Sequence, residues 1–157
     1  MTPILLTTGQ ILSAHARLRP TEIGARDMER SLSYQEWNAR ACRLANALIG
    51  LGLAKGDRVA VLAYNRLEWA EIYTATAKAG LIPVPINFRL TGTEAAFIIN
   101  DSGAAAVIVE DALLPTLDAA RADIHIPEDR FILIGGTPRA GYHGYEDLLS
   151  AASDTEP

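Results

Sequence analysis

The sequence predicts an α/β fold with a doubly wound, mostly parallel sheet, and three observations support this prediction. Short apolar runs alternate with stretches of helical periodicity from Val59 to the end of the chain. This alternation is typical of parallel strands that are joined by helical crossovers. The run from Val59 to Ala63 is apolar at every position, as expected of a strand buried on both faces. With 157 residues, of which 49% are hydrophobic, the chain is long enough for one domain with a sizeable core.

The elements that precede the sheet are expected to be a short helix, a small hairpin and a long helix. The short helix spans residues 9–18 and ends before Pro20, because proline cannot continue it. The segments 22–26 and 30–32 flank a polar turn, which favours a hairpin. The long helix carries apolar side chains at spacings of three and four, which share one helical face: Tyr34, Trp37, Ala41, Leu44, Leu48 and Leu51.

Strands and helices then alternate through the rest of the domain. We expect strands at residues 59–63, 82–86, 106–109 and 131–134, and helices ending at Gly80, running through Ile99, and covering residues 113–121 and 145–152. The polar residues 153–157 are interpreted as a linker. Residues 1–152 are therefore expected to form the folded unit.

Three predicted helix starts carry a capping signal, in which a residue with a side-chain oxygen is followed by Glu three positions later. In such a box, the first side chain accepts from a free helical N–H and the glutamate bonds back. The pairs are Ser33 with Glu36, Asn65 with Glu68, and Thr91 with Glu94.

The strand at residues 82–86 contains two prolines, Pro83 and Pro85. Residues two apart in a strand direct their backbone groups to the same side, and proline has no N–H to donate. We expect that side to be a sheet edge, a bulge or a short pairing. The other side, served by Ile82, Val84 and Ile86, is expected to pair normally.

Composition and residue spacing argue against several classes of function. The formal net charge is −5 and the 14 basic residues are scattered, which disfavours a nucleic-acid surface. The single cysteine, Cys42, forms neither an internal disulfide nor a cysteine metal cage and is interpreted as a small apolar helix residue. The three histidines lie far apart and form no metal-binding motif. No apolar run has the length of a membrane span and no secretory signal is recognised, so a cytoplasmic location is expected.

Two segments contain closely spaced glycines, a feature that ligand-binding loops share. The segment 50–56 does not fit the dinucleotide-binding fingerprint, because its third glycine is one position late and it follows a helix. It is interpreted as a helix stop and a turn. Gly135 and Gly136 follow a predicted strand, where a simple turn is favoured over contact with a ligand. The residues alone therefore identify no catalytic group and no metal site.

Several short motifs nevertheless occur in an informative order. They are Leu32–Trp37 (Leu-Ser-Tyr-Gln-Glu-Trp), Gly56–Val61, Asn65–Trp69, Ala77–Gly80, Val84–Asn87 and Ile99–Ala104. This series resembles the N-terminal region of adenylate-forming enzymes, which include acyl-CoA synthetases, luciferases and peptide-synthetase adenylation domains. The family usually has Leu where this chain has Trp37, a change between two apolar residues. The segment 87–90 (Asn-Phe-Arg-Leu) is most similar to acyl-CoA synthetases.

The resemblance implies that the chain is the N-terminal subdomain of an AMP-forming acyl-CoA synthetase, a ligase of fatty-acid metabolism. Such an enzyme uses ATP, Mg and CoA. The family's phosphate-binding loop is expected after Pro157, and its magnesium carboxylate, ribose-binding Asp and catalytic Lys are expected later still. The chain is therefore expected to have no catalytic or metal-binding residue and no cofactor of its own. It is expected to be inactive alone, with the remainder of the parent enzyme as its partner.

One binding residue follows from the resemblance. Arg89 stands after the 82–86 strand, where family members can present an arginine to a phosphate of CoA. Arginine suits this role because its planar guanidinium is always charged and can bind phosphate through two hydrogen bonds. The alternative is a surface arginine that solvates a loop.

Two other interpretations of the chain stay open. One is a stand-alone α/β binding or interaction module without catalysis, and the other is a nucleotide-binding Rossmann domain, which the imperfect glycine motif disfavours. Because a parallel sheet needs cover on both faces, the chain alone is expected to self-associate. The alternative is a monomer in which the helix at 145–152 folds over the exposed face.

Overall fold

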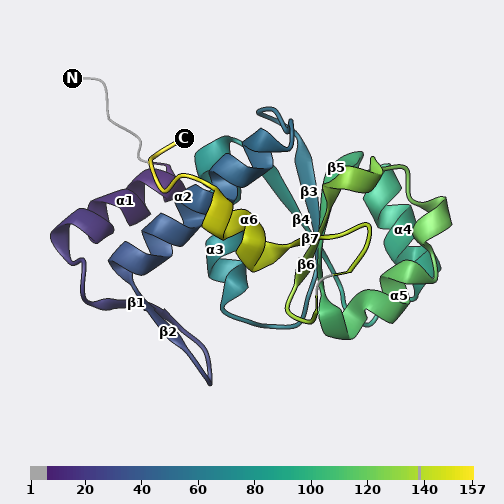
Figure 1. Ribbon diagram of the computed structural model, residues 1–157, viewed down its shortest axis with the longest axis horizontal. Coiled ribbons are helices and arrows are strands. Elements are labelled where there is room, and N and C mark those ends of the chain that lie inside the picture. Colours follow the sequence, from purple (N-terminus) through teal and green to yellow (C-terminus); the bar gives the residue numbers. More distant parts are fainter. Residues whose placement is uncertain (1–6, 138) are drawn as a thin grey trace.

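The computed structural model, which describes residues 7–137 and 139–157, contains a five-stranded sheet between two layers of helices (Figure 1). The strand order is β4-β3-β5-β6-β7, and every neighbouring pair is parallel. The strands are β3 (Arg58–Leu62), β4 (Ile82–Ile86), β5 (Ala104–Glu110), β6 (Phe131–Ile134) and β7 (His143–Gly144). The predicted α/β class with a parallel sheet is confirmed.

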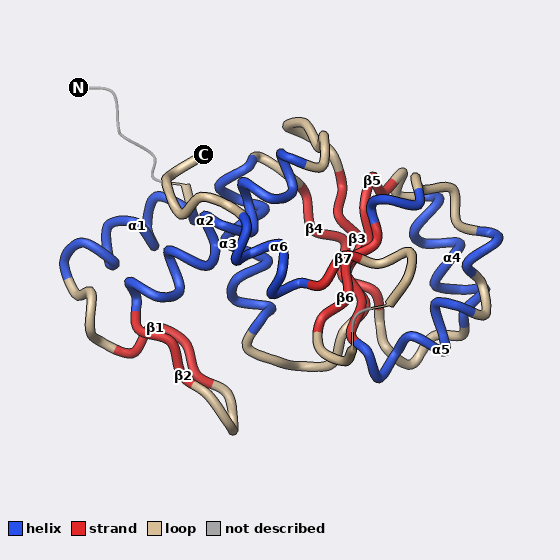
Figure 2. The backbone as a smooth tube through the Cα atoms, in the orientation of Figure 1, coloured by secondary structure: helices blue, strands red, loops and turns tan. Residues whose placement is uncertain are grey.

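Six α-helices and a separate hairpin complete the described part of the chain. The helices are α1 (Thr8–Leu18), α2 (Tyr34–Gly50), α3 (Glu68–Ala79), α4 (Gly92–Asp101), α5 (Leu114–Asp118) and α6 (Tyr145–Ala151). The hairpin consists of β1 (Ile23–Arg26) and β2 (Ser31–Ser33), which pair antiparallel and project from the helical layer away from the sheet (Figure 2). Short 3-10 turns are present at η1 (Asp111–Leu113), η2 (Arg121–Asp123) and η3 (Glu128–Arg130).

Strands are added first on one side of β3 and then on the other, which explains why helices cover both faces of the sheet. The chain passes from β3 to β4 on one side, and then returns beyond β3 to reach β5 on the other side. Crossovers between parallel strands are almost always right-handed, so crossovers in opposite directions lie on opposite faces. Accordingly, α1, α2, α3 and α6 lie on one side of the sheet, and α4 and α5 lie on the other (Figure 1).

The strands alternate their side chains between two separate apolar cores. In β3, Val59 and Val61 pack under α2 and α3, whereas Ala60 and Leu62 pack under α4 and α5. The strands β5 and β6 alternate in the same way. Residues 59–62, 106–109 and 131–134 are all buried, which explains why the central strands appear in the sequence as continuous apolar runs.

Two of the three predicted capping pairs are confirmed. Ser33 Oγ accepts from the Glu36 N–H at 3.2 Å, and the Glu36 carboxylate accepts the Ser33 N–H at 2.8 Å. Thr91 and Glu94 form the same arrangement at the start of α4. A further capping box at α1, between Thr7 and Gln10, was not predicted.

The predicted cap by Asn65 is wrong. The helix α3 begins at Glu68, and the residue before it, Leu67, already has right-handed helical backbone angles and makes no side-chain cap. The Glu68 carboxylate is unavailable for a capping box, because Arg30 and Arg66 both donate to it. Two other predictions need adjustment: the helix expected at 113–121 is reduced to α5 with flanking 3-10 turns, and the short β7 was not expected.

The edge predicted from the two prolines is confirmed. Among the described residues, β4 forms one edge of the sheet and pairs only with β3. In this pairing Pro83 aligns with Val59 and Pro85 with Val61. The N–H of Ile82 donates to Asp57 O at 2.9 Å, so the even-numbered positions face β3. The backbone groups of Pro83 and Pro85 therefore face away from β3. Because no strand pairs on that side, the absent N–H groups cost no hydrogen bond of the sheet.

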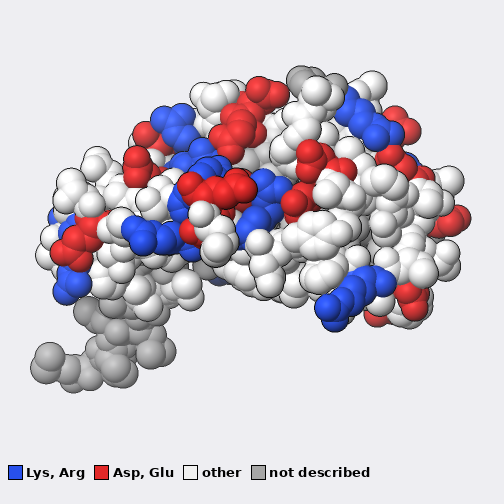
Figure 3. Space-filling model, turned by 90° about the horizontal axis from the view of Figure 1, so that it is seen from below, with Lys and Arg blue, Asp and Glu red and all other residues white. Residues whose placement is uncertain are grey.

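The polar segment 153–157 lies against α2 and α1 (Figure 1). Its interpretation as a linker stays a prediction. None of the described helices has the length and apolar character needed to cross a bilayer. On the face shown in Figure 3, acidic and basic side chains lie interspersed and form no broad surface of a single sign.

Candidate functional site

The candidate site lies at the carboxyl edge of the sheet, where β3, β4, β5 and β6 end. In open parallel sheets, ligands bind outside the carboxyl ends of the strands, where the order of strands reverses. Here that reversal lies between β3 and β5. The residues at or just after the ends of these four strands include Tyr64, Arg89, Glu110 and Gly135.

An aromatic pair lies across the ends of β3 and β4. The rings of Tyr64 and Phe88 have their centroids 4.8 Å apart and are tilted by 59°, and the guanidinium carbon of Arg89 lies 5.4 Å from the centroid of Phe88. The backbone N–H of Arg89 donates to the Asn87 side-chain oxygen at 3.0 Å, which shapes the turn after β4. Arg89 is exposed, and among the described residues no group accepts a hydrogen bond from its guanidinium. Arg89 therefore presents a positive charge to solvent beside the aromatic pair at this edge.

A second feature of the edge is a chain of ion pairs that joins the hairpin loop, α3 and β5. Glu68 accepts from Arg30 at 2.6 Å and from Arg66 at 2.7 Å. Arg66 also pairs with Glu110 at 3.1 Å, and Glu110 accepts the backbone N–H of Tyr64 at 2.7 Å. These groups line a surface cavity of about 500 Å³, together with the hairpin residues 27–29.

Both carboxylates of this chain of ion pairs are committed to internal partners. The Glu68 side chain is 3% exposed, and its burial opposes ionisation, but the hydrogen bonds from Arg66 and Arg30 outweigh that effect and lower its pKa. Burial also opposes the charge of Arg66, but the hydrogen bond to Glu68 and the negative charges of Glu68, Glu110 and Asp111 together outweigh it and raise the pKa of Arg66. The ion pairs therefore hold the strand ends together, with Glu68 and Glu110 as internal partners of Arg30 and Arg66.

The histidines and the single cysteine lie away from Arg89. His15 lies on α1, His125 in the loop before β6 and His143 on β7, so none stands beside Arg89 in the sheet order. Cys42 is buried in α2, as its interpretation as an apolar helix residue predicts. Among the residues that the structure describes, no group of three or more His, Cys, Asp or Glu side chains is placed to hold a metal ion.

The glycine segments lie where their interpretation as turns places them. The segment 50–56 connects α2 to the amino end of β3, opposite the edge where ligands bind, and Gly52 and Gly56 adopt φ of 85° and 94°. Gly135 and Gly136 form a bend after β6 with positive φ, beside the Asp111 side chain. Neither segment forms a phosphate cradle at the start of a helix.

Arg89 was predicted as a binding residue from the sequence, but the residues that surround it were not. Tyr64 and Glu110 stand at the ends of β3 and β5, and this position was a usable signal. Their contacts with Phe88 and Arg66 depend on the strand order, which the residues do not specify.

Comparisons with known proteins give a consistent result. The model of the family described as "AMP-binding enzyme" matches residues 12–153. A long-chain-fatty-acid–CoA ligase, FadD13 of Mycobacterium tuberculosis, is 42% identical over 123 residues, which are 78% of this chain and 24% of the relative. A fatty acid–[acyl-carrier-protein] ligase, ScoC of Streptomyces coeruleorubidus, is 35% identical over 99% of this chain and 29% of the relative.

Solved structures give the same picture. The anthranilate CoA ligase AuaEII, solved in complex with anthranoyl-AMP, superposes with a TM-score of 0.90 and 27% identity. That superposition covers 98% of this chain and 29% of the ligase. The chain thus spans less than a third of the length of these relatives.

Proposed function

The chain belongs to the AMP-binding enzyme family, and on that premise we propose that it is the N-terminal part of an ATP-dependent acyl-CoA synthetase. The parent enzyme joins a carboxylic acid to CoA and converts ATP to AMP and pyrophosphate. The observation that carries the proposal is the fold: 98% of this chain superposes on 29% of a CoA ligase, with a TM-score of 0.90. The fatty-acid ligases among its relatives support a role in fatty-acid metabolism. A cytoplasmic location is part of the same proposal.

In this proposal, the chain acts as a scaffold and contributes one wall of the ligand channel. ATP and Mg supply the activation chemistry, in which the acid carboxylate attacks the α-phosphate and pyrophosphate leaves. Such chemistry depends on positioning and on neutralising charge. The described residues offer no group of three or more side chains placed to hold a divalent ion, and Glu68 and Glu110 are held in ion pairs, so we assign these tasks to the rest of the parent.

The test of this function is an assay of the natural full-length protein. We expect it to release AMP only when a carboxylic acid, ATP, Mg and CoA are all present. A panel of short, long and aromatic acids identifies the substrate. If none of the acids supports AMP release by folded full-length protein, the proposed function is wrong.

Arg89 is proposed to bind a phosphate of CoA in the parent enzyme. Two observations support this: its exposed guanidinium lies at the carboxyl edge, and it lies over the Phe88 ring, which packs against Tyr64. CoA carries several phosphates, and the planar fork of arginine matches their oxygens.

Removing the Arg89 charge separates CoA binding from adenylation. A charge-assisted hydrogen bond contributes about 1.5–3 kcal/mol, so Arg89→Ala should raise the KM for CoA about tenfold or more. Acid-dependent ATP–pyrophosphate exchange, which needs no CoA, should stay at the wild-type rate. The matched control is Arg17→Ala, which removes an exposed arginine on α1. An unchanged KM for CoA in the Arg89 variant would show that this residue only solvates its loop.

A further inference from the structure

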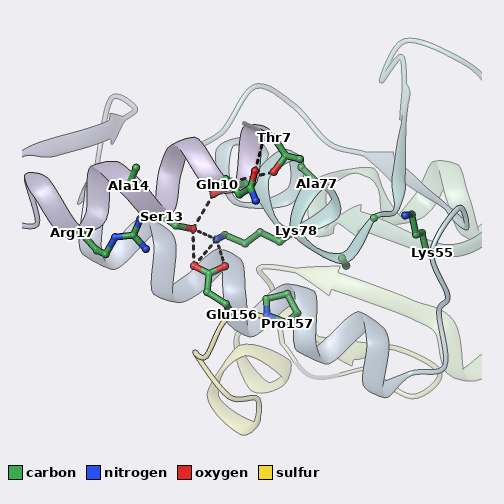
Figure 4. A pocket seen from close by; sticks show the side chains of 13 residues that line it. Thr7, Gln10, Ser13, Ala14, Arg17, Lys55, Ala77, Lys78, Glu156 and Pro157 are labelled. Atoms are coloured by element: carbon green, nitrogen blue, oxygen red, sulfur yellow. Dashed lines mark hydrogen bonds and ion pairs between the residues drawn. The ribbon is translucent and has the colours of Figure 1, made fainter. Parts of the chain in front are cut away.

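A lysine near the end of α3 is buried to an unusual degree. The Lys78 side chain is 2% exposed, whereas lysines are almost never fully buried unless they are paired. Its ammonium donates to Ser13 Oγ at 2.7 Å and to both oxygens of Glu156, at 2.7 and 2.9 Å (Figure 4). The partner carboxylate comes from the segment 153–157, which is 78 positions away in the sequence.

The Glu156 carboxylate is bound by side chains from three helices. Ser13 of α1 donates to it at 2.6 Å, Asn38 of α2 at 3.3 Å, and Lys78 of α3 through the two bonds above. Partial burial opposes ionisation of Glu156, but the bonds from Lys78 and Ser13 outweigh it and lower the pKa of the carboxyl group. The group is therefore ionised at neutral pH.

A second set of bonds, independent of the carboxylate, holds the same segment. Asn46 donates to the backbone oxygens of Ser153 and Thr155, both at 2.9 Å. Arg43 donates to Ala152 O at 3.0 Å and pairs with Asp154 at 3.1 Å. Asn38 and Asn46 are eight positions apart on α2, and residues at this spacing share a helical face. This face of α2 therefore supplies the polar side chains that bind residues 153–157.

We propose that Ser13, Asn38 and Lys78 form a carboxylate-binding site, and that Glu156 occupies it as a clasp fastening residues 153–157 to α1, α2 and α3. An exposed ion pair contributes little, because solvent screens it and both side chains lose freedom. Here the Lys78 side chain is 2% exposed and the Glu156 side chain 53% exposed, so solvent screens the pair from one side only, and Ser13 and Asn38 donate to the same carboxylate. Because Glu156 is ionised at neutral pH, we expect the clasp to be mostly closed there. Because it involves only this chain, the inference does not rest on the proposed function.

The chain contains its own reporter for the state of the clasp. Cys42 is the single cysteine, it is fully buried, and its sulfur lies 3.8 Å from Asn38 Nδ2. A buried thiol reacts with a disulfide reagent only when the structure above it opens. The rate at which Cys42 reacts under native conditions thus measures opening of the clasp.

The experiment compares thiol-labelling rates of the wild type, Glu156→Gln and a matched control at about pH 8. Burial raises the pKa of the Cys42 thiol, so at this pH the reactive thiolate forms mainly once the site has opened to solvent. The control, Glu128→Gln, changes an exposed glutamate in η3. We expect Glu156→Gln to react at least about tenfold faster than the wild type, and Glu128→Gln to react at the wild-type rate, with both variants unfolding near the wild-type urea midpoint. Equal labelling rates for the two variants would overturn the clasp.

A second variant keeps the test decisive if Glu156→Gln does not fold. Ser13→Ala removes one donor but keeps the ion pair, and alanine is favourable inside a helix. A folded Ser13→Ala protein should show faster Cys42 labelling, by a smaller factor. An unchanged rate in this variant would equally contradict the proposal.

Discussion

Glu71 shows how this fold accommodates a charge inside its core. The side chain is fully buried between α2, α3 and α6. Arg40 donates to it at 2.6 Å, and the buried hydroxyl of Tyr145 donates at 2.7 Å. Burying a carboxylate is costly unless such partners surround it, so each partner depends on the others.

Removal of the Glu71 carboxylate is expected to destabilise the chain strongly. Glu71→Ala leaves Arg40 partly buried with only Glu146 as a partner and should lower the free energy of unfolding by about 3 kcal/mol or more. Tyr145→Phe removes one hydrogen bond and should cost about 1 kcal/mol. Urea unfolding followed by circular dichroism measures both values. Equal losses for the two variants would mean that Glu71 does not anchor this cluster.

The pH dependence of stability reports on Glu68. Its pKa in the folded state is lowered below the ordinary value of 4.5, so the carboxylate stabilises the fold above that value. This contribution is lost as the pH falls through the folded pKa. The difference in unfolding free energy between the wild type and Glu68→Gln should therefore be large at neutral pH and smaller at about pH 3. A difference that stays constant between these two conditions contradicts this role of the ion pairs.

Glu68 also marks the limit of prediction at the scale of residues. Its spacing from Asn65 is the spacing of a capping box, and the same pattern was correct at Ser33 and Thr91. At Ser33 and Thr91, both partners lie within one helical turn and nothing competes for the glutamate. At Glu68, Arg30 arrives from a hairpin 38 positions away, and local spacing contains no information about it.

Whole elements were predictable where their signals were local and strong. The long α2 followed from apolar spacing over several turns, and β3, β5 and β6 followed from continuous apolar runs. The strand β7 has only two residues, His143 and Gly144, and exists because β6 pairs with it. A strand this short depends on tertiary contacts, and two residues are too few to show the alternating pattern that predicts a strand.

The two prolines of β4 are expected to protect an open sheet edge. Pro83 and Pro85 remove outward-facing N–H donors, which blocks regular addition of another strand. The double variant Pro83→Val/Pro85→Val should therefore aggregate more readily than the wild type. Static light scattering during incubation at matched concentrations measures this, with Pro127→Val in an exposed loop as the control. If the double variant scatters no more than the control, the prolines have no protective role.

At the scale of the molecule, exposed apolar side chains support the prediction that the isolated chain self-associates. Phe97 on α4 is 67% exposed, and Ile82 on β4 and Tyr73 on α3 are about half exposed. These three elements are consecutive around the free edge of the sheet. In the proposed parent, the following part of the enzyme covers such surface.

Light scattering across a dilution series tests self-association. We expect a mass above 16.9 kDa at micromolar concentration, and a lower mass for Phe97→Asp, because a charge disfavours apolar pairing. Glu128→Gln serves as a surface control without an apolar side chain. A mass of 16.9 kDa at every dilution would contradict self-association and favour a self-sufficient domain.

The architecture was predicted better than its order. Alternating strand and helix signals were enough for a parallel sheet, since parallel neighbours need crossovers. The order β4-β3-β5-β6-β7 was not predicted, and with it the meeting of Tyr64, Phe88 and Arg89. Strand order depends on which crossovers pack together, and that choice is made by long-range contacts.

Acid-dependent ATP–pyrophosphate exchange by the isolated chain shows whether this chain contains a complete adenylation site. We assign the phosphate-binding and catalytic groups to the remainder of the proposed parent enzyme, and a scaffold role and a CoA-binding arginine to this chain. A full-length CoA ligase of the family serves as the positive control, with the same acids and the same magnesium concentration. The predicted result is exchange by the full-length ligase and none by the isolated chain above a protein-free control. Reproducible exchange by the purified chain would contradict the account, because it would require a complete adenylation site within these 157 residues.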